Sequence, residues 1–302
     1  MHGWIILDKP LGLGSTQGVS AVKRALRDAG VPKGVKVGHG GTLDPLATGV
    51  LPIALGEATK LAGRMLDASK VYEFTIRFGE QTSTLDAEGE VVATSDLLPT
   101  LAQVEAVLPR FTGPIEQAPP MYSAIKIDGK RAYDRARAGE EVEMKLRSVT
   151  INSLQVTGQD SVRVEGRELE QVTLTAHVSK GTYIRSLARD IALALGTVGS
   201  VTMLRRTRAG PFTLAQAISL DNLADAGRSR ALEQLMLPLT AGLDDIPALT
   251  VTSEEALLLR QGRVLAGDPR KQGLMLAIQG DMPVALVEAL GLEIRVVRGF
   301  NL

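Results

Sequence analysis

Asp44 lies in the segment GHGGTLDPLATGVLPIALGEATK, residues 38–60, which is dense in residues that could do chemistry. The three glycines before Asp44 let the backbone adopt positive φ or approach a ligand closely. Pro45 biases Asp44 toward an extended conformation. The pattern indicates an acid held on a stiff, glycine-flanked loop. Local chemistry also allows Asp44 to organise a simple turn, as many Asp-Pro pairs do.

Two other segments carry side chains that could act with this acid. The segment VSKGTYIRSLARD, residues 178–190, passes from a predicted strand to a predicted helix and places Tyr183 and Arg185 at the junction. An arginine there could pair with a carboxylate, orient it and hold it ionised, although an ordinary surface arginine also fits the pattern. Tyr72 lies on the apolar face of an alternating segment. It is either a core tyrosine or a ring that stacks on an extruded base.

Composition and motifs exclude several kinds of chemistry. The sequence contains no cysteine, so a disulfide, a zinc site with thiolate ligands and a thiol nucleophile are all ruled out. The three histidines, at positions 2, 39 and 177, lack the spacing of metal ligands. The glycine-rich motifs of phosphate-binding loops and the G-x-S-x-G motif of serine hydrolases are also missing. We therefore expect chemistry without a metal or cofactor.

Strands and helices must position these side chains, and they alternate irregularly along the first 245 residues. The predicted elements are strands at residues 4–7, 71–78 and 172–178, helices at 16–29, 99–108 and 187–195, and a loop at 38–49. Thr16 is the expected N-cap of the first helix, and Gly30 its end. Because no regular β-α-β rhythm is present, we expect an α+β fold with a mixed, mainly antiparallel sheet flanked by helices.

The pattern changes after Asp244. Ile246 and Pro247 resemble a junction, and three short apolar runs follow, separated by glycine-rich turns. The sequence thus predicts two domains, residues 1–245 and a small β-rich domain at 246–302.

The formal net charge is zero, but the charges are unevenly distributed. Residues 177–211 carry six Lys or Arg and one acid, whereas residues 80–118 carry seven acids and one Arg. Basic segments could form one positive face for a phosphate backbone, or simply lie on solvated surfaces. The N-terminus lacks a signal-peptide layout, and no apolar run reaches the length of a membrane span, so we expect a cytoplasmic protein.

Taken together, the motifs resemble those of the TruB-type pseudouridine synthases, the family of bacterial tRNA pseudouridine-55 synthases. The GTLDPLATG string carries most of the specificity. The other matching blocks occur in the family's order over nearly the whole chain: GWIILDKPLG (3–12), KVYEFTIRFGEQTSTLDAEGEV (70–91), PPMYSAIKIDGKRAYDRARAG (119–139), SKGTYIRSLARD (179–190) and LRRTRAGPF (204–212).

The resemblance implies a fold, a reaction and a set of roles. It implies the pseudouridine synthase fold with a small C-terminal PUA-like RNA-binding domain, and the isomerisation of uridine 55 in the T-loop of tRNA without a cofactor. Asp44 would be the catalytic aspartate, Tyr72 would stack on the target base and serve in proton transfer, and Arg185 would pair with Asp44. The implied substrate-binding residues are His39, which contacts flipped nucleotides, Asp86, which holds the RNA or the active-site loop, Leu204, an apolar pocket residue, and the pocket-lining Lys60 and Tyr183.

The sequence departs from the family pattern at Gly14, Gly40, Val178, Gly199 and Ser200. These changes put RNA contacts in question more than the reaction. The resemblance implies a monomer that binds the T-arm of tRNA without a guide RNA, an obligatory protein partner or a membrane. Two other readings stay open, an RNA chaperone that refolds tRNA and a subunit of an RNA-guided synthase.

Overall fold

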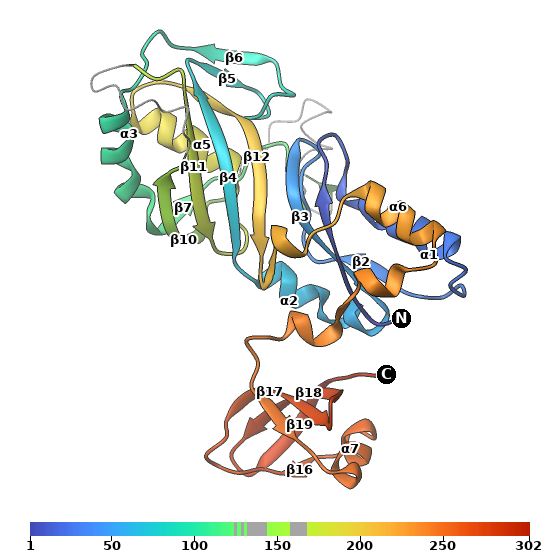
Figure 1. The fold of residues 1–302 in the computed structure, drawn as a ribbon. Helices are drawn as coiled ribbons and strands as arrows, with labels where there is room; N and C mark the ends of the chain where they lie inside the picture. The colour runs from blue at the N-terminus through green and yellow to red at the C-terminus, as the bar shows by residue number, and fades with distance from the viewer. Residues whose placement is uncertain (124–125, 128–129, 132–143, 158–167) are drawn as a thin grey trace.

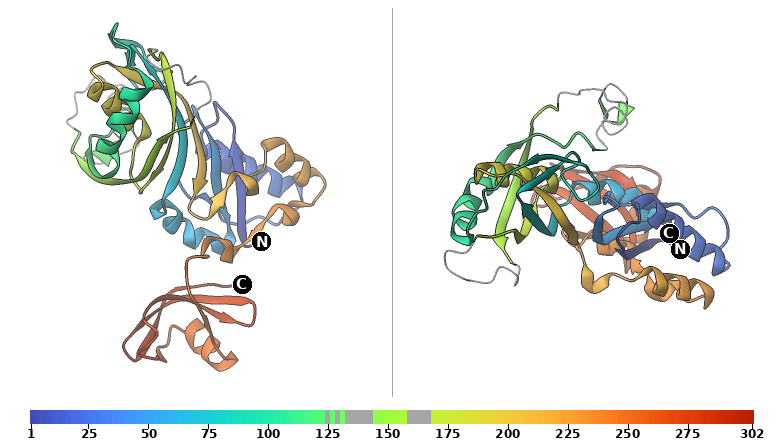
Figure 2. Two further views of the ribbon diagram at one scale, coloured as in Figure 1. Left: turned by 60° about the vertical axis from the view of Figure 1, so that its left-hand side comes forward. Right: turned by 90° about the horizontal axis from the view of Figure 1, so that it is seen from above.

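The chain forms two parts, each built on its own β-sheet (Figure 1). The structure is a computed structural model that describes residues 1–123, 126–127, 130–131, 144–157 and 168–302. The larger part contains a ten-stranded sheet, and the smaller, C-terminal part contains a five-stranded sheet. The N- and C-termini lie near each other, where the two parts meet (Figures 1 and 2).

The ten-stranded sheet is mixed and mainly antiparallel, as predicted. Its strands are β1 (Gly3–Lys9), β2 (Val37–His39), β3 (Ala47–Leu55), β4 (Lys70–Phe78), β7 (Gly113–Gln117), β10 (Arg147–Val156), β11 (Gln171–Val178), β12 (Gly199–Ala209), β13 (Phe212–Thr213) and β14 (Leu237–Pro238). They run in the order β14-β1-β3-β12-β4-β11-β10-β7, with β2 paired to β3 and β13 to β12. Within the described ranges, β3 and β12 form the one parallel pair of this sheet.

Strand β12 joins the two halves of the sheet. On one side Leu204 lies opposite Ala47 at the start of β3, and on the other it lies opposite Phe74 in β4. Tyr72 of β4 is one same-face position from Phe74, because side chains alternate along a strand. This register brings the loop that precedes Ala47, which contains Asp44, beside the tyrosine of β4.

Helices cover the sheet in two groups. The α-helices of the larger part are α1 (Ser15–Asp28), α2 (Ala62–Asp67), α3 (Leu101–Val107), α5 (Ile184–Ala194) and α6 (Leu220–Arg228). The 3₁₀ helices are η1 (Gly56–Leu61), η2 (Leu108–Phe111), η3 (Leu214–Gln216), η4 (Leu232–Leu235) and η5 (Leu239–Gly242). Helices α1 and α6 lie side by side over β1 and β3, at the end of the sheet away from α3 and α5 (Figure 1).

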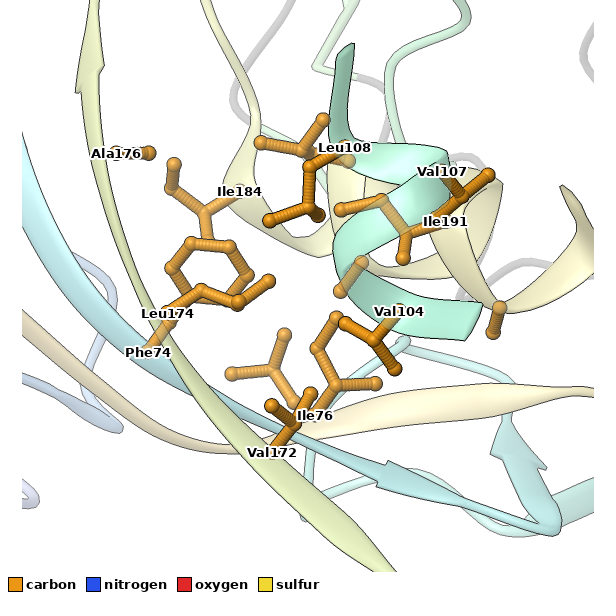
Figure 3. Packing of buried hydrophobic residues seen from close by; sticks show 14 of the residues in the cluster. Phe74, Ile76, Val104, Val107, Leu108, Val172, Leu174, Ala176, Ile184 and Ile191 are labelled. Carbon is orange, nitrogen blue, oxygen red and sulfur yellow. The ribbon is translucent and has the colours of Figure 1, made fainter. Parts of the chain in front are cut away.

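Helices α3 and α5 bury their apolar stripes against β4 and β11. Figure 3 shows Val104 of α3 and Ile191 of α5 packed over Phe74, Ile76 and Leu174. All five are fully buried, and burial at this scale contributes roughly 1.5–3 kcal/mol for each large side chain. This core fixes α5, and with it the helix N-terminus that carries Arg185.

Two local predictions were wrong in detail. The N-cap of α1 is Gly14, and its amide donates to Gln17 Oε1 at 2.7 Å, whereas Thr16 lies inside the helix. Residues 38–49 do not form one continuous loop, because β2 ends at His39 and β3 begins at Ala47. The predicted strands 4–7, 71–78 and 172–178 correspond to β1, β4 and β11, and the predicted helices to α1, to α3 with η2, and to α5.

The C-terminal part is β-rich, as predicted. Its elements are β15 (Ala248–Thr250), α7 (Ser253–Arg260), β16 (Leu265–Ala266), β17 (Gly273–Gln279), β18 (Met282–Leu290) and β19 (Glu293–Gly299).

Two small ladders lie outside both sheets, β5 (Glu80–Thr82) with β6 (Val91–Thr94), and β8 (Lys126–Ile127) with β9 (Lys130–Arg131). None of the described helices is both long and apolar enough to cross a membrane.

The two parts share a hydrophobic cluster. Leu276, Leu286 and Phe300 of the C-terminal part belong to the same buried cluster as Trp4 and Phe212. The rings of Trp4 and Phe212 lie 5.1 Å apart, centroid to centroid, in a tilted arrangement. The shared apolar surface fixes the C-terminal part against the end of the larger sheet.

Candidate active site

The loop that carries Asp44 is held by its backbone. Ser15, at the start of α1, accepts a hydrogen bond from the Leu43 amide at 2.8 Å and donates one to the Leu43 carbonyl at 3.0 Å. Arg206 of β12 is 1% exposed and donates to the carbonyls of Gly41 and Thr42, each at 3.2 Å. These bonds fix the chain just before Asp44.

A second buried cation holds the chain on the other side of Asp44. Lys9, the last residue of β1, is fully buried, and its Nζ donates to the carbonyls of Leu13 at 2.5 Å and Pro45 at 3.3 Å. Burial lowers the pKa of Lys9 to about 8, with Asp44 opposing the shift and Arg206 adding to it. Lys9 and Arg206 therefore hold the backbone on both sides of Asp44 by hydrogen bonds to its carbonyls.

Arg185 connects Asp44 with a second carboxylate. Its Nη2 lies 2.9 Å from Asp44 Oδ2, and its Nη1 lies 3.2 Å from Asp86 Oδ2. The same guanidinium donates to the carbonyls of Thr84 at 2.8 Å and Tyr122 at 3.0 Å. The pairing of Arg185 with Asp44 agrees with the expectation, and each terminal guanidinium nitrogen contacts one carboxylate and one backbone carbonyl.

Exposure differs sharply within this network. The Arg185 side chain is 8% exposed and that of Asp86 11%, whereas the Asp44 side chain is 44% exposed. A buried cation with buried partners stays in place, because removing one partner leaves an uncompensated charge. Asp44 is thus a positioned carboxylate with part of its surface open to a ligand.

The Asp86 carboxylate is held by hydrogen bonds within a turn between β5 and β6. Thr84 Oγ1 donates to Asp86 Oδ1 at 2.5 Å, the Glu88 amide donates to the same oxygen at 3.1 Å, and Leu85 adopts a positive φ of 64°. The Asp86 carboxylate therefore joins this turn to Arg185.

A cavity of about 1130 Å³ opens at Asp44. Most of the expected site residues line it: Asp44, Tyr72, Arg185, His39, Asp86, Tyr183 and Leu204. Tyr72 and Leu204 come from neighbouring strands and also pack against the two hydrophobic clusters on either side. The wall near Asp44 therefore combines an aromatic ring, an aliphatic side chain and an ion pair.

Tyr183, at the N-cap of α5, and His39, at the end of β2, both line this cavity. The Tyr183 backbone forms two hydrogen bonds with the buried amide of Gln117, at 2.8 and 3.1 Å. Burial raises the pKa of the Tyr183 phenol. Burial and the nearby Arg206 lower the pKa of His39, which favours a neutral ring. In the described part of the chain, nothing completes a hydrogen bond with His39 Nδ1.

The structure does not bring Lys60 to this cavity, contrary to the expectation. Lys60 lies in η1, where its Nζ forms a 2.6 Å ion pair with Glu57 and donates to the Gly299 carbonyl at 2.8 Å. The Asn301 amide donates to Glu57 Oε2 at 2.9 Å. Lys60 therefore joins the larger part to the last strand of the C-terminal part.

Close packing explains two of the departures from the family pattern. A Cβ at Gly40 would lie 2.6 Å from Met65 Cβ, so the close approach of α2 to this loop leaves room only for glycine there. A Cβ at Gly199 would lie 2.9 Å from the Arg77 carbonyl oxygen and 3.1 Å from Ala192 Cβ.

The other three departures from the family pattern lie in three different local environments. Val178 is buried in the core beneath α5, and Ser200 donates to the Glu80 carbonyl at 3.1 Å. Gly14 caps α1 at the edge of the cavity.

Sequence reasoning missed the roles of Lys9, Arg206 and Gln117. The local sequence does not mark the two cations as buried, because Lys9 follows Asp8 at the end of β1 and Arg206 lies in the basic run 205–208 of β12. Nothing local marks Gln117, because its partner is 66 residues away in the chain.

The comparisons with known proteins identify the family of the chain. Residues 27–184 match the N-terminal domain of the TruB family of pseudouridylate synthases, and residues 185–244 match the tRNA pseudouridylate synthase B C-terminal domain. The chain is 63% identical to "tRNA pseudouridine synthase B" of Novosphingobium aromaticivorans, over 100% of this chain and 98% of that one. It is 59% identical to the protein of the same name from Zymomonas mobilis, over 100% and 96% of the two chains.

Solved structures show the same fold. A Cbf5-Nop10-Gar1 complex contains a chain that superposes with a TM-score of 0.74 at 27% identity, over 99% of this chain and 85% of that one. An H/ACA RNP bound to a substrate RNA containing 2'-deoxyuridine gives a TM-score of 0.72 at 25% identity, with the same coverage. The sequence matches and the positioned Asp44 lead to one conclusion: the chain belongs to the TruB family of pseudouridylate synthases.

Proposed function

We propose that this enzyme converts uridine 55 in the T-loop of tRNA to pseudouridine, with Asp44 as the catalytic carboxylate. The observation that supports this most directly is the Asp44–Arg185 pair, in which a buried arginine holds a half-exposed carboxylate at the cavity. The relatives named tRNA pseudouridine synthase B support tRNA as the substrate.

The reaction breaks the N-glycosidic bond of uridine, rotates the base and rejoins it through carbon. The target uracil must leave its stack to reach Asp44, because the reacting atoms are inaccessible inside folded RNA. A base that stacks on Tyr72 regains part of the cost, about 1–3 kcal/mol if this ring behaves as other aromatic stacking partners do. Leu204 provides an apolar contact on the neighbouring strand.

Asp44 acts as an ionised group in each route that fits the site. It attacks C1′ of the ribose, abstracts a proton at C2′, or attacks C6 of the base. Its contact with Arg185 uses Oδ2, so Oδ1 is the oxygen that we assign to the nucleotide. Tyr72 serves in the proton transfer that completes the reaction.

The remaining contacts position the RNA. His39 and Tyr183 line the cavity, where they contact the extruded nucleotides. We place the domain boundary at residues 245/246 and assign the C-terminal part as a PUA-like RNA-binding domain that binds phosphates, since phosphate contacts set orientation rather than sequence. We further propose that the enzyme is a cytoplasmic monomer that needs no guide RNA, in contrast to the assemblies named for its structural neighbours.

The experiment is pseudouridine formation by the purified chain on an unmodified T-arm hairpin. We expect stoichiometric conversion of the uridine at position 55 without added protein, RNA or metal. A hairpin in which that uridine is replaced by cytidine is the matched control. Turnover only after addition of a guide RNA, or at another uridine, would contradict the proposal.

A further inference from the structure

The hydroxyl of Ser123 is buried beside the Asp44 cavity without a hydrogen-bond partner. Ser123 is 4% exposed and belongs to the cavity lining. Over the residues that the structure describes, nothing completes a hydrogen bond with its Oγ. An unpaired buried hydroxyl destabilises the folded state, so its presence requires an explanation.

The backbone at Ser123 is fixed to the catalytic network. Arg185 Nη2, which lies 2.9 Å from Asp44 Oδ2, also donates to the Tyr122 carbonyl at 3.0 Å. The Ser123 amide donates to the Met121 carbonyl at 3.0 Å. One guanidinium nitrogen therefore positions both Asp44 and the residue that precedes Ser123.

A second hydroxyl lies close to that of Ser123. Burial raises the pKa of the Tyr183 phenol, and the nearby Ser123 hydroxyl acts in the opposite direction. That opposing effect is one of hydrogen bonding between the two side chains, so the hydroxyls are neighbours. Their contact does not meet the distance and angle of a formed hydrogen bond, which leaves Ser123 Oγ without a partner among the described residues. Asp44 and Arg185 also act on the pKa of Tyr183, so the Tyr183 hydroxyl lies within electrostatic range of the ion pair.

We propose that Ser123 is a substrate-binding residue whose hydroxyl hydrogen-bonds to the nucleotide in the Asp44 cavity. The inference rests on the proposed function, in which this cavity receives a uridine. A serine hydroxyl without a bond can rotate between staggered χ1 positions at little cost. Uridine offers carbonyl oxygens on the base and a hydroxyl on the ribose, and a serine hydroxyl can donate to either.

The stability of the free enzyme separates this role from a structural one. Ser123→Ala removes an unpaired group, so the unfolding temperature of the free chain stays the same or rises. A hydroxyl with a structural bond would give a fall. Thr197→Val is the matched control, because Thr197 Oγ1 is also buried and unpaired among the described residues but lies outside the cavity lining. We expect this control to keep wild-type turnover.

Turnover is then measured on the T-arm hairpin. Ser123→Ala lowers kcat/KM by about fivefold to tenfold, the loss expected for one neutral hydrogen bond, and Ser123→Thr restores most of it. Unchanged turnover by Ser123→Ala, or a lowered unfolding temperature of the free variant, would overturn the proposal.

Binding in an Asp44→Asn background identifies the contacted group. The Kd of the hairpin is compared with and without Ser123→Ala, for a target uridine, a target 2′-deoxyuridine and an abasic target. An effect that disappears with the abasic target assigns the contact to the base, and one that disappears with 2′-deoxyuridine assigns it to the ribose. An effect that persists with both overturns the proposal. If wild-type protein makes no pseudouridine but binding still depends on Ser123, the proposed reaction fails and this inference stands.

Discussion

Arg185 Nη2 lies 2.9 Å from Asp44 Oδ2, although the arginine side chain is 8% exposed and the aspartate side chain 44%. This difference in exposure indicates that Arg185 positions Asp44 and not the reverse. Arg185 is held by Asp86 and by two backbone carbonyls, so its position does not depend on Asp44. The part of the Asp44 side chain that Arg185 does not cover, in contrast, is exposed to the cavity.

The first prediction concerns the shape of the guanidinium. Arg185→Lys keeps the charge but cannot reach two carboxylates and two carbonyls at once, because an ammonium lacks the planar fork. We expect kcat to fall by roughly 100-fold, as expected when a catalytic group is misplaced by about an ångström. Arg189→Lys, on the same helix, is the control and should keep normal kcat. Equal rates for the two variants would show that the fork is not needed.

The second prediction concerns Gly40. Gly40→Thr would place a Cβ 2.6 Å from Met65 Cβ, and overpacking of this kind costs about 1–3 kcal/mol in the free energy of unfolding. Adding Met65→Gly, which removes that Cβ, should recover part of that loss in a double-mutant cycle measured by urea unfolding. Gly38→Ala, where a Cβ meets nothing within 4 Å, is the control. A Gly40→Thr variant as stable as the Gly38→Ala variant would contradict the packing explanation.

The third prediction concerns the pH dependence of stability. Lys70 is buried and donates to the carbonyls of Met65, Leu66 and Ala68 at 2.6–2.9 Å, and burial lowers its pKa to about 8. Between pH 8 and the unfolded value of 10.5 the unfolded chain binds more protons at this group, so its contribution to stability rises with pH.

Urea unfolding at several pH values measures this effect. The stability of wild type relative to Lys70→Met should increase from pH 8 to pH 10, with a slope of at most about 1.4 kcal/mol per pH unit. Lys23→Met, on the exposed face of α1, is the control for general charge effects. A relative stability that stays flat or falls over the same range would mean that Lys70 keeps its proton in the folded chain.

The fourth prediction separates the two roles considered for Lys60. Because Lys60 binds Glu57 and the Gly299 carbonyl, Lys60→Met should increase hydrogen exchange in β19 and raise KM for full-length tRNA, with kcat little changed. A residue of the catalytic cavity would give the reverse, a lowered kcat with normal exchange in β19. Kinetics on full-length tRNA and on the T-arm hairpin together decide between them.

Periodicity predicted the elements better than it predicted side-chain partners. The alternation from Val71 to Phe78 correctly indicated β4, because its apolar face is buried by α3 and α5. The N-cap at Thr16 was wrong because the helix begins at Ser15, whose side chain binds the Leu43 backbone, and Gly14 is the N-cap, with its amide bonded to Gln17 Oε1. Such choices depend on which distant backbone groups need partners.

At the site, too, the residues could be predicted from the sequence better than their side-chain partners could. The motif order brought Asp44, Tyr72 and Arg185 together as a hypothesis, and the structure places all three at one cavity. The contact of Arg185 with Asp86 depends on the turn between β5 and β6, and the direction of the Lys60 side chain depends on the docked C-terminal part. Neither can be read from local sequence, because both partners are fixed by tertiary packing.

The most direct test of the account is the Asp44→Asn substitution. The amide has nearly the same shape as the carboxylate, and its oxygen can remain beside Arg185 as an acceptor, so we expect a folded protein that binds tRNA normally. Asp67→Asn, at an exposed ion pair with Lys180, is the matched control. Pseudouridine formation on tRNA is predicted to be abolished by Asp44→Asn and retained by the control. Normal turnover by the Asp44→Asn enzyme would contradict the assignment of Asp44 as the catalytic carboxylate.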